Sequence, residues 1–70
     1  MKLSARNILK GKVKKVNQGA VNSEVIVEVT NAVEMVSIVT KAAVENLGLK
    51  EGKEVYVVIN STDVVLATDF

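Results

Sequence analysis

The 70-residue sequence contains no cysteine, histidine, proline or tryptophan, and only one tyrosine and one phenylalanine. Without cysteine, disulfides, thiolate metal sites and a cysteine nucleophile are excluded. Because histidine is missing as well, the usual zinc sites and most transition-metal sites are excluded, and we expect no direct ligands to a metal cation. The commonest general base and the Ser-His-Asp triad are also lost, so we do not expect an enzyme.

Long apolar runs are missing too. None approaches the roughly 18 residues that a membrane span needs, and no secretory signal follows Met1, so the sequence predicts a cytoplasmic protein without a membrane partner. The length predicts a single domain over residues 1–70. A chain this small buries a modest core, and with no disulfide or zinc site available, oligomerisation is the common remaining way to stabilise it.

Charge is unevenly distributed, although the net charge is only +1. Residues 1–23 carry six basic side chains and no acid, whereas residues 24–70 carry three lysines against eight acids, a charge of −5. A basic start indicates attraction to an anion or to the acidic part of another copy. A solvated strand face rich in lysine is the alternative.

Valine makes up fifteen of the residues and favours strands. The pattern predicts strands over 8–17, 23–30, 34–40, 53–60 and 63–68, and a short helix over 41–47 with Thr40 as its N-cap. This order predicts an all-β fold with one short helix, a five-stranded OB-fold-like Greek-key barrel. An open five-stranded meander and an SH3-like barrel are the alternatives.

The first expected strand is irregular. Gly11 within it indicates a bend or a close approach of another backbone. Val16 breaks the two-residue alternation set by Leu9, Gly11 and Val13, so we expect a bulge near residues 14–15.

The strands are apolar on both faces in places. The residues that alternate with the expected core valines are Ile26, Val36, Ile38, Tyr56, Val58 and Val65. Strands that are apolar on both faces need a second covering layer, and the simplest layer is another copy of the chain. We therefore expect an oligomer.

Hydrogen-bond donors suited to a small anion cluster near the start of the chain. Residues 3–7 include Ser4, Ala5 and Arg6, and in an extended segment Ser4 and Arg6 point the same way. Arg6 is the only arginine, and its planar fork suits a tetrahedral oxyanion better than a lysine does. The alternative is an ordinary surface arginine in a frayed terminus.

Three further segments are rich in donors. They are the turn that contains Gly19, Ala20 and Val21, the helix start at Thr40 and Lys41, and the loop at Asn60 and Ser61. Taken singly, each is better explained as an ordinary turn, helix cap or loop. Nucleic-acid binding would need aromatic stacking platforms, but Tyr56 is expected to be buried and Phe70 is the last residue, so we expect no nucleic-acid partner.

The chain resembles the molbindin (Mop) family, which is related to TOBE domains. The motifs that carry the resemblance are 4–7 (SARN), 9–13 (LKGKV), 19–25 (GAVNSEV), 38–40 (IVT), 47–52 (LGLKEG) and 61–64 (STDV). They follow in order with family-like spacing over essentially all 70 residues.

The resemblance implies an OB-like fold and a homo-hexamer built as a trimer of dimers. It implies binding of molybdate or tungstate at subunit interfaces, for storage and homeostasis in the cytoplasm, with no organic cofactor and no catalysis. A regulatory or dimerisation module of the TOBE type and an OB-type nucleic-acid-binding domain are the alternatives.

The family's oxyanion-binding positions map onto residues of this chain. Ser4 and Arg6, with Ala5 between them, match its N-terminal ligands. The segments 19–21 and 40–41 match a turn and a helix start of the family. Asn60, followed by Ser61, stands where the family usually has lysine, which removes one positive charge from each subunit.

The apolar second face leads to a first prediction. Replacing Ile38 with Asp should break the oligomer, because a carboxylate in an apolar interface would be buried without compensation. Sedimentation velocity would measure the change as a fall in the size of the particle. An Ile38→Asp protein that sediments as a hexamer would refute the prediction that this strand buries apolar side chains on both of its faces.

Overall fold

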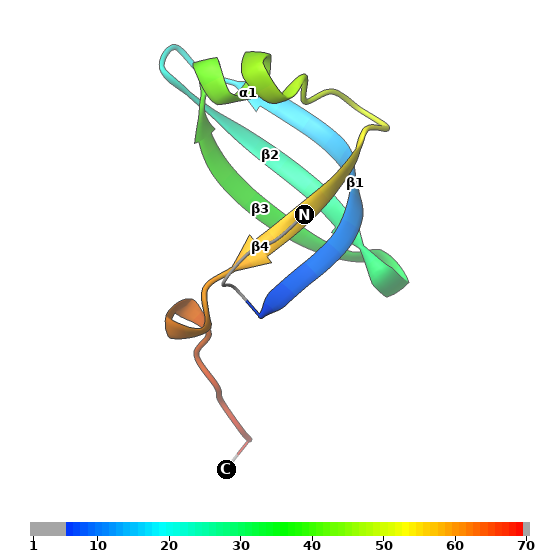
Figure 1. The fold of residues 1–70 in the computed structure, drawn as a ribbon, viewed down its shortest axis with the longest axis vertical. Helices are drawn as coiled ribbons and strands as arrows, with labels where there is room; N and C mark the ends of the chain where they lie inside the picture. Colours follow the sequence, from blue (N-terminus) through cyan, green and yellow to red (C-terminus); the bar gives the residue numbers. More distant parts are fainter. Residues whose placement is uncertain (1–5, 70) are drawn as a thin grey trace.

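The computed structural model describes residues 6–69, apart from the side chain of Asn31, and it consists mainly of antiparallel strands (Figure 1). The elements are β1 (Asn7–Gln18), β2 (Asn22–Val29), β3 (Val33–Thr40), α1 (Lys41–Leu47) and β4 (Glu54–Ile59), with single 3-10 turns at η1 (Thr30–Ala32) and η2 (Ser61–Asp63). The strands form one sheet in the order β3-β2-β1-β4. A β fold with one short helix between the third and fourth strands is thus confirmed.

Strand β1 is the longest element and pairs with two other strands. Its first half, Asn7–Lys12, pairs with β4, and its second half, from Lys12 onward, pairs with β2. The sheet therefore curves around β1, as the ribbon shows (Figure 1). Gly11 lies close against β2, because a Cβ atom there would stand 2.6 Å from the Glu28 carbonyl oxygen and 2.8 Å from Val27 Cγ1. This is the close approach that the sequence predicted.

The bulge in β1 is also confirmed. The register with β2 shifts between Val13 and Lys15, which leaves Lys14 without a paired residue. The Lys14 ammonium instead reaches across β2 to Glu34 on β3. The hydrogen bond with Glu34 and the negative charge of that carboxylate raise the pKa of Lys14 above its ordinary value. The pair is exposed, so its contribution to stability is small.

The core is formed almost entirely by valine. Val13, Val25, Val27 and Val29 from the sheet and Val44 from α1 are the buried apolar residues. On β2 they alternate with outward-facing residues, as a strand with one buried face requires. Helix α1 lies over one end of the sheet and supplies Val44 to this core (Figure 1).

Local sequence sets both ends of α1. Thr40 is the N-cap, and its hydroxyl accepts a hydrogen bond from the Ala43 N–H with an N···O distance of 3.0 Å. Gly48 ends the helix at a φ of 62°, a left-handed conformation that glycine adopts without a steric penalty. The Lys53 ammonium donates to the Leu47 carbonyl at the same end. None of the helices formed by residues 6–69 has the length and apolar character that a membrane crossing requires.

The predicted fifth strand at 63–68 differs from the structure. In the single chain, η2 ends at Asp63, and residues 64–69 run outward with no strand assigned (Figure 1). The sheet is therefore open, and the five-stranded barrel is not found in the isolated chain. The physical reason is that no strand formed by residues 6–69 lies beside residues 64–69 to supply hydrogen-bond partners.

The outer face of the sheet carries two apolar patches. One is formed by Ile26, Val36 and Ile38 on β2 and β3, and the other includes Tyr56 and Val58 on β4. Tyr56 is 57% exposed, so the expectation that it is buried is wrong. The side chain turns away from the core because β4 alternates and Val55 and Val57 occupy its inner positions. In one chain these patches face solvent, and the predicted oligomer stays a prediction.

The contact at Gly11 gives a prediction about stability. Gly11→Ala should lower the free energy of unfolding by about 1–3 kcal/mol, because the new methyl group would force β1 away from β2. Urea denaturation would measure the loss. Lys15→Ala, an exposed change on the same strand, is the control and should alter stability by about 0.5 kcal/mol or less. Equal stability of the two variants would contradict the close-contact role of Gly11.

Candidate functional site

The predicted anion-binding residues fall into two groups at opposite ends of β1. One group follows the end of the strand, and the other lies at its beginning. Ser4 and Ala5 lie outside the described residues, so the structure places only the other eight. Because β1 has twelve residues at about 3.3 Å each, the groups are separated by about 40 Å along the strand.

The first group is the turn–helix cluster, defined as residues 19–21 and 40–41. Asn22 pairs with Thr40 across β2 and β3, which brings the β1–β2 turn beside the start of α1 (Figure 1). The Lys41 N–H donates to the Val21 carbonyl, with an N···O distance of 3.0 Å. Two segments about twenty positions apart in the chain are thus joined directly.

The donors of this cluster are only partly free. The Gly19 N–H already donates to the Asn22 carbonyl at 2.9 Å, and the Lys41 N–H donates to the Val21 carbonyl. Gly19 has a negative φ, so its role is not the left-handed turn that glycine often makes. A side chain there would place Cβ 2.5 Å from the Asn22 carbonyl oxygen. Among residues 6–69 no backbone acceptor is found for the N–H groups of Ala20 and Val21, which leaves these two available.

The second group is the strand-start cluster, defined as Arg6, Asn60 and Ser61. The pairing of β1 with β4 ends at Asn7 and Ile59. Arg6 comes just before Asn7 and Asn60 comes just after Ile59, so both residues lie beyond the same end of this antiparallel pair. Asn60 is also the residue before η2, and its carbonyl accepts a hydrogen bond from the Asp63 N–H at 2.9 Å. The Asn60 side chain makes no capping hydrogen bond there, so its amide stays available as a donor.

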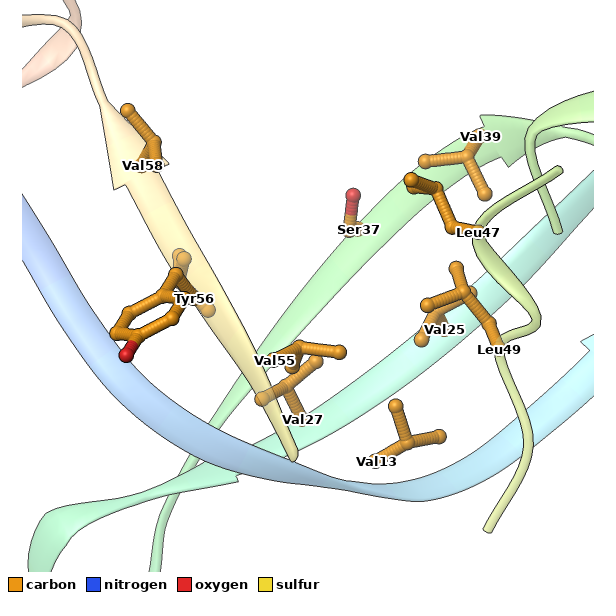
Figure 2. Close-up of a pocket in the computed structure, with 11 residues that line it drawn as sticks. Val13, Val25, Val27, Ser37, Val39, Leu47, Leu49, Val55, Tyr56 and Val58 are labelled. Carbon is orange, nitrogen blue, oxygen red and sulfur yellow. The ribbon is translucent and has the colours of Figure 1, made fainter. Parts of the chain in front are cut away.

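Exposure is the property that all eight placed residues share. Each of them is exposed in the single chain, in both clusters. Two hollows formed by residues 6–69, one between β3 and β4 (Figure 2) and one beside Gly11, are lined by other side chains. One chain therefore presents donors of hydrogen bonds at two places and encloses neither of them.

Two features of the described chain were missed in the sequence. Ser23 begins the buried face of β2 and is 2% exposed, and its hydroxyl has no hydrogen-bond partner within residues 6–69. The alternation Ser23, Val25, Val27 already indicated a polar residue at a core position. The second feature is a groove between β3 and β4, which no pattern in the sequence indicated because it exists only where two distant strands fail to meet.

Known proteins resemble this chain in sequence along nearly its whole length. The family model described as "TOBE domain" matches residues 3–66. Molybdenum-pterin-binding protein 3 of Clostridium pasteurianum is 47% identical over 66 residues, which cover 94% of this chain and 97% of that protein. The chain belongs to the Mop family of TOBE domains.

Solved structures of Mop proteins share the fold. MopII from Clostridium pasteurianum superposes with a TM-score of 0.89 at 43% identity, covering 96% of this chain and all of that one. The cytoplasmic molybdate-binding protein ModG, in a form with molybdate bound, has a TM-score of 0.89 at 48% identity. That match covers 93% of this chain and 46% of ModG.

Thr40 serves α1 as well as the turn–helix cluster, which gives a testable prediction. Thr40→Ala should lower the free energy of unfolding by about 1 kcal/mol, because the Ala43 N–H loses its acceptor. Thermal unfolding followed by circular dichroism would measure it. Thr40→Ser keeps the hydroxyl and should stay close to the parent chain. If the serine variant loses as much stability as the alanine variant, the cap is not the cause.

Proposed function

We propose that this chain is a single Mop domain over residues 1–70 that binds molybdate or tungstate at the interfaces of a homo-hexamer, a trimer of dimers. Its role is storage and homeostasis of the oxyanion in the cytoplasm, without catalysis and without an organic cofactor. The proposed ligands are the turn–helix cluster, the strand-start cluster, and Ser4 and Ala5 beside Arg6.

The observation that carries this proposal is the exposure of every placed donor. Both clusters supply side chains and backbone N–H groups, yet each is open to solvent in one chain. A dianion held only by exposed groups is well screened by water and is bound weakly. A second chain that covers the cluster would exclude water and add its own donors. The presence of bound molybdate in ModG supports the choice of ligand.

Molybdate suits this donor set chemically. At neutral pH it is a tetrahedral dianion with acceptor oxygens only, so a good site presents N–H and O–H groups and no carboxylate. Charge-assisted hydrogen bonds from Arg6 and Lys41 would offset the cost of removing the anion from water. Sulfate has the same charge and shape but is smaller, and discrimination would come largely from the size of the enclosed space.

Asn60 sets the charge of the strand-start cluster. With lysine absent there, Arg6 is the cationic side chain that the structure places in this cluster. The Asp63 carboxylate follows two residues after Ser61 and opposes an anion. Anion binding at this cluster therefore depends on Arg6 more strongly than it would with a lysine at position 60.

The two alternatives explain fewer observations. An OB-type nucleic-acid module needs several stacked aromatics, and Tyr56 is the single aromatic side chain in residues 6–69. A regulatory or dimerisation module of the TOBE type would use the apolar patches but gives no reason for two donor clusters. Oxyanion storage accounts for both the apolar patches and the donors.

Native mass spectrometry of the parent chain and of Arg6→Ala tests the proposal. The parent should appear as a six-chain species that gains discrete molybdate masses, because its clusters are covered in the assembly. Arg6→Ala should keep the assembly and lose the molybdate masses that depend on the strand-start cluster. The loss of a charged hydrogen bond corresponds to about 1.5–3 kcal/mol, or roughly ten-fold or more in affinity.

Sulfate at equal concentration is the ligand control, and Lys50→Ala, an exposed change outside both clusters, is the protein control. Neither should alter the pattern. A monomer or dimer that gains no molybdate would refute storage at shared interfaces. Unchanged molybdate uptake by Arg6→Ala would refute the role given to that residue.

A further inference from the structure

One carboxylate lies beside the turn–helix cluster on the outer face of the sheet. Glu24 is on β2, two residues after Asn22, and it alternates with the buried residues of that strand, so both side chains face outward. Across from Glu24 on β3 is Ile38, two residues before Thr40. Glu24 and Thr40 are therefore diagonal neighbours on one face, about 7–8 Å apart.

A neutral side chain holds this carboxylate in place. The Asn17 amide, directly opposite on β1, donates a hydrogen bond to Glu24 Oε1 with an N···O distance of 3.0 Å. An amide fixes the position of a carboxylate without cancelling its charge. The two ion pairs found among residues 6–69 involve other acids. The negative charge of Glu24 is thus held at a fixed place beside the cluster.

Two opposite charges would act on a dianion in the turn–helix cluster. The Lys41 ammonium attracts it, and the Glu24 carboxylate repels it. The two differ in exposure, because Lys41 is exposed and Glu24 is half buried. A separation of about 10 Å is close to the Debye length at 0.1 M salt, so the repulsion is only partly screened. A second chain that covers the cluster would exclude water and strengthen both interactions.

We propose that Glu24 sets the affinity of the turn–helix cluster by repelling the bound dianion and so favouring its release. This inference rests on the proposed function and deepens it, because the residue that it names is not a ligand. A storage protein must release its anion as well as hold it. A fixed like charge shortens the residence of the anion without removing any hydrogen-bond donor. Because Glu24 acts through charge alone, it weakens the binding of every dianion alike and leaves selectivity to the size of the site.

The test must separate the charge of Glu24 from its hydrogen bond. The bond with Asn17 joins the end of β1 to the start of β2, so its loss alone could disturb the nearby turn. Glu24→Gln removes the charge and keeps an oxygen that accepts from the Asn17 amide. Glu28→Gln is the matched control, because Glu28 faces outward on the same strand about 13 Å further from the turn.

Isothermal titration with molybdate compares the parent chain with these two variants. In about 0.01 M salt, Glu24→Gln should bind molybdate roughly three-fold more tightly, the value for charges of −1 and −2 about 10 Å apart in water. Glu28→Gln should differ from the parent by less than about 1.5-fold, because its charge is more distant. The same comparison in Arg6→Ala, where the strand-start cluster is weakened, assigns the change to the turn–helix cluster.

Salt distinguishes a charge effect from a structural one. In about 1 M salt the Debye length is about 3 Å, so Glu24→Gln and the parent should then bind molybdate equally. A gain in affinity that persists in 1 M salt would overturn the proposal. Equal or weaker binding by Glu24→Gln at low salt would overturn it as well.

Two further substitutions keep the proposal testable if Glu24→Gln does not fold. Glu24→Thr also removes the charge, with a residue that favours strands, and should tighten binding in the same way. Glu24→Asp keeps the charge and should stay close to the parent. Circular dichroism and sedimentation establish that each variant is folded and assembled. A threonine variant that binds no more tightly than the aspartate variant would contradict the role of the charge.

The parent titration separates this inference from the proposed function. A parent chain that binds no molybdate would refute the proposed function and the inference that rests on it. A parent chain that binds molybdate as tightly as Glu24→Gln would refute only the inference and leave the proposed function in place.

Discussion

The close approach of β1 and β2 at Gly11 is the contact on which the rest of the sheet depends. β1 pairs with β4 through its first half and with β2 through its second half, both pairings include Lys12, and the sheet curves around this strand (Figure 1). The missing side chain at Gly11 leaves room for the Glu28 backbone on this curve. Val13, two positions later, then turns into the core beside Val25 and Val27. A sheet bent in this way brings β3 and β4 toward each other without joining them, and the groove is the result.

A core of five small side chains cannot cover all the apolar surface of 70 residues. Much of the remainder lies in four places: the two outer patches of the sheet, the groove between β3 and β4, and the C-terminal tail, residues 64–69. Donor groups for an anion are likewise left exposed at both ends of β1. In the proposed function a second copy of the chain covers both kinds of surface: it buries apolar side chains and encloses the donors. Binding at such interfaces would stabilise the assembled state by linkage.

Much of the fold was predictable from local signals. The alternation of valines in β2, the N-cap at Thr40 and the broken alternation at Val16 each act within a few residues, and the structure has each where the sequence indicated. The expected fifth strand failed because a strand is defined by its partner, and the sequence of one chain does not show whether that partner is present. Tyr56 was misplaced because an apolar strand does not reveal which of its two faces is covered.

In the candidate site, too, the sequence predicts local features and does not show contacts between distant segments. The sequence indicates segments 19–21 and 40–41 separately as sources of donors, and the structure brings them together through a backbone hydrogen bond from the Lys41 N–H to the Val21 carbonyl. No sequence pattern showed that the Gly19 N–H donates a hydrogen bond to the Asn22 carbonyl, because that bond depends on the geometry of the turn. The resemblance to the Mop family supplied the choice of ligand, which residue chemistry alone narrowed only to a small anion.

The length of β1 has an electrostatic consequence for the proposed binding of anions at both of its ends. The clusters lie at opposite ends of a twelve-residue strand, a path of about 40 Å along the chain, and exposed charges farther apart than the Debye length, about 8 Å at physiological ionic strength, are largely screened from each other. Two dianions on one chain would therefore barely repel each other. Filling one cluster of a chain would leave the free energy of filling the other cluster of the same chain almost unchanged.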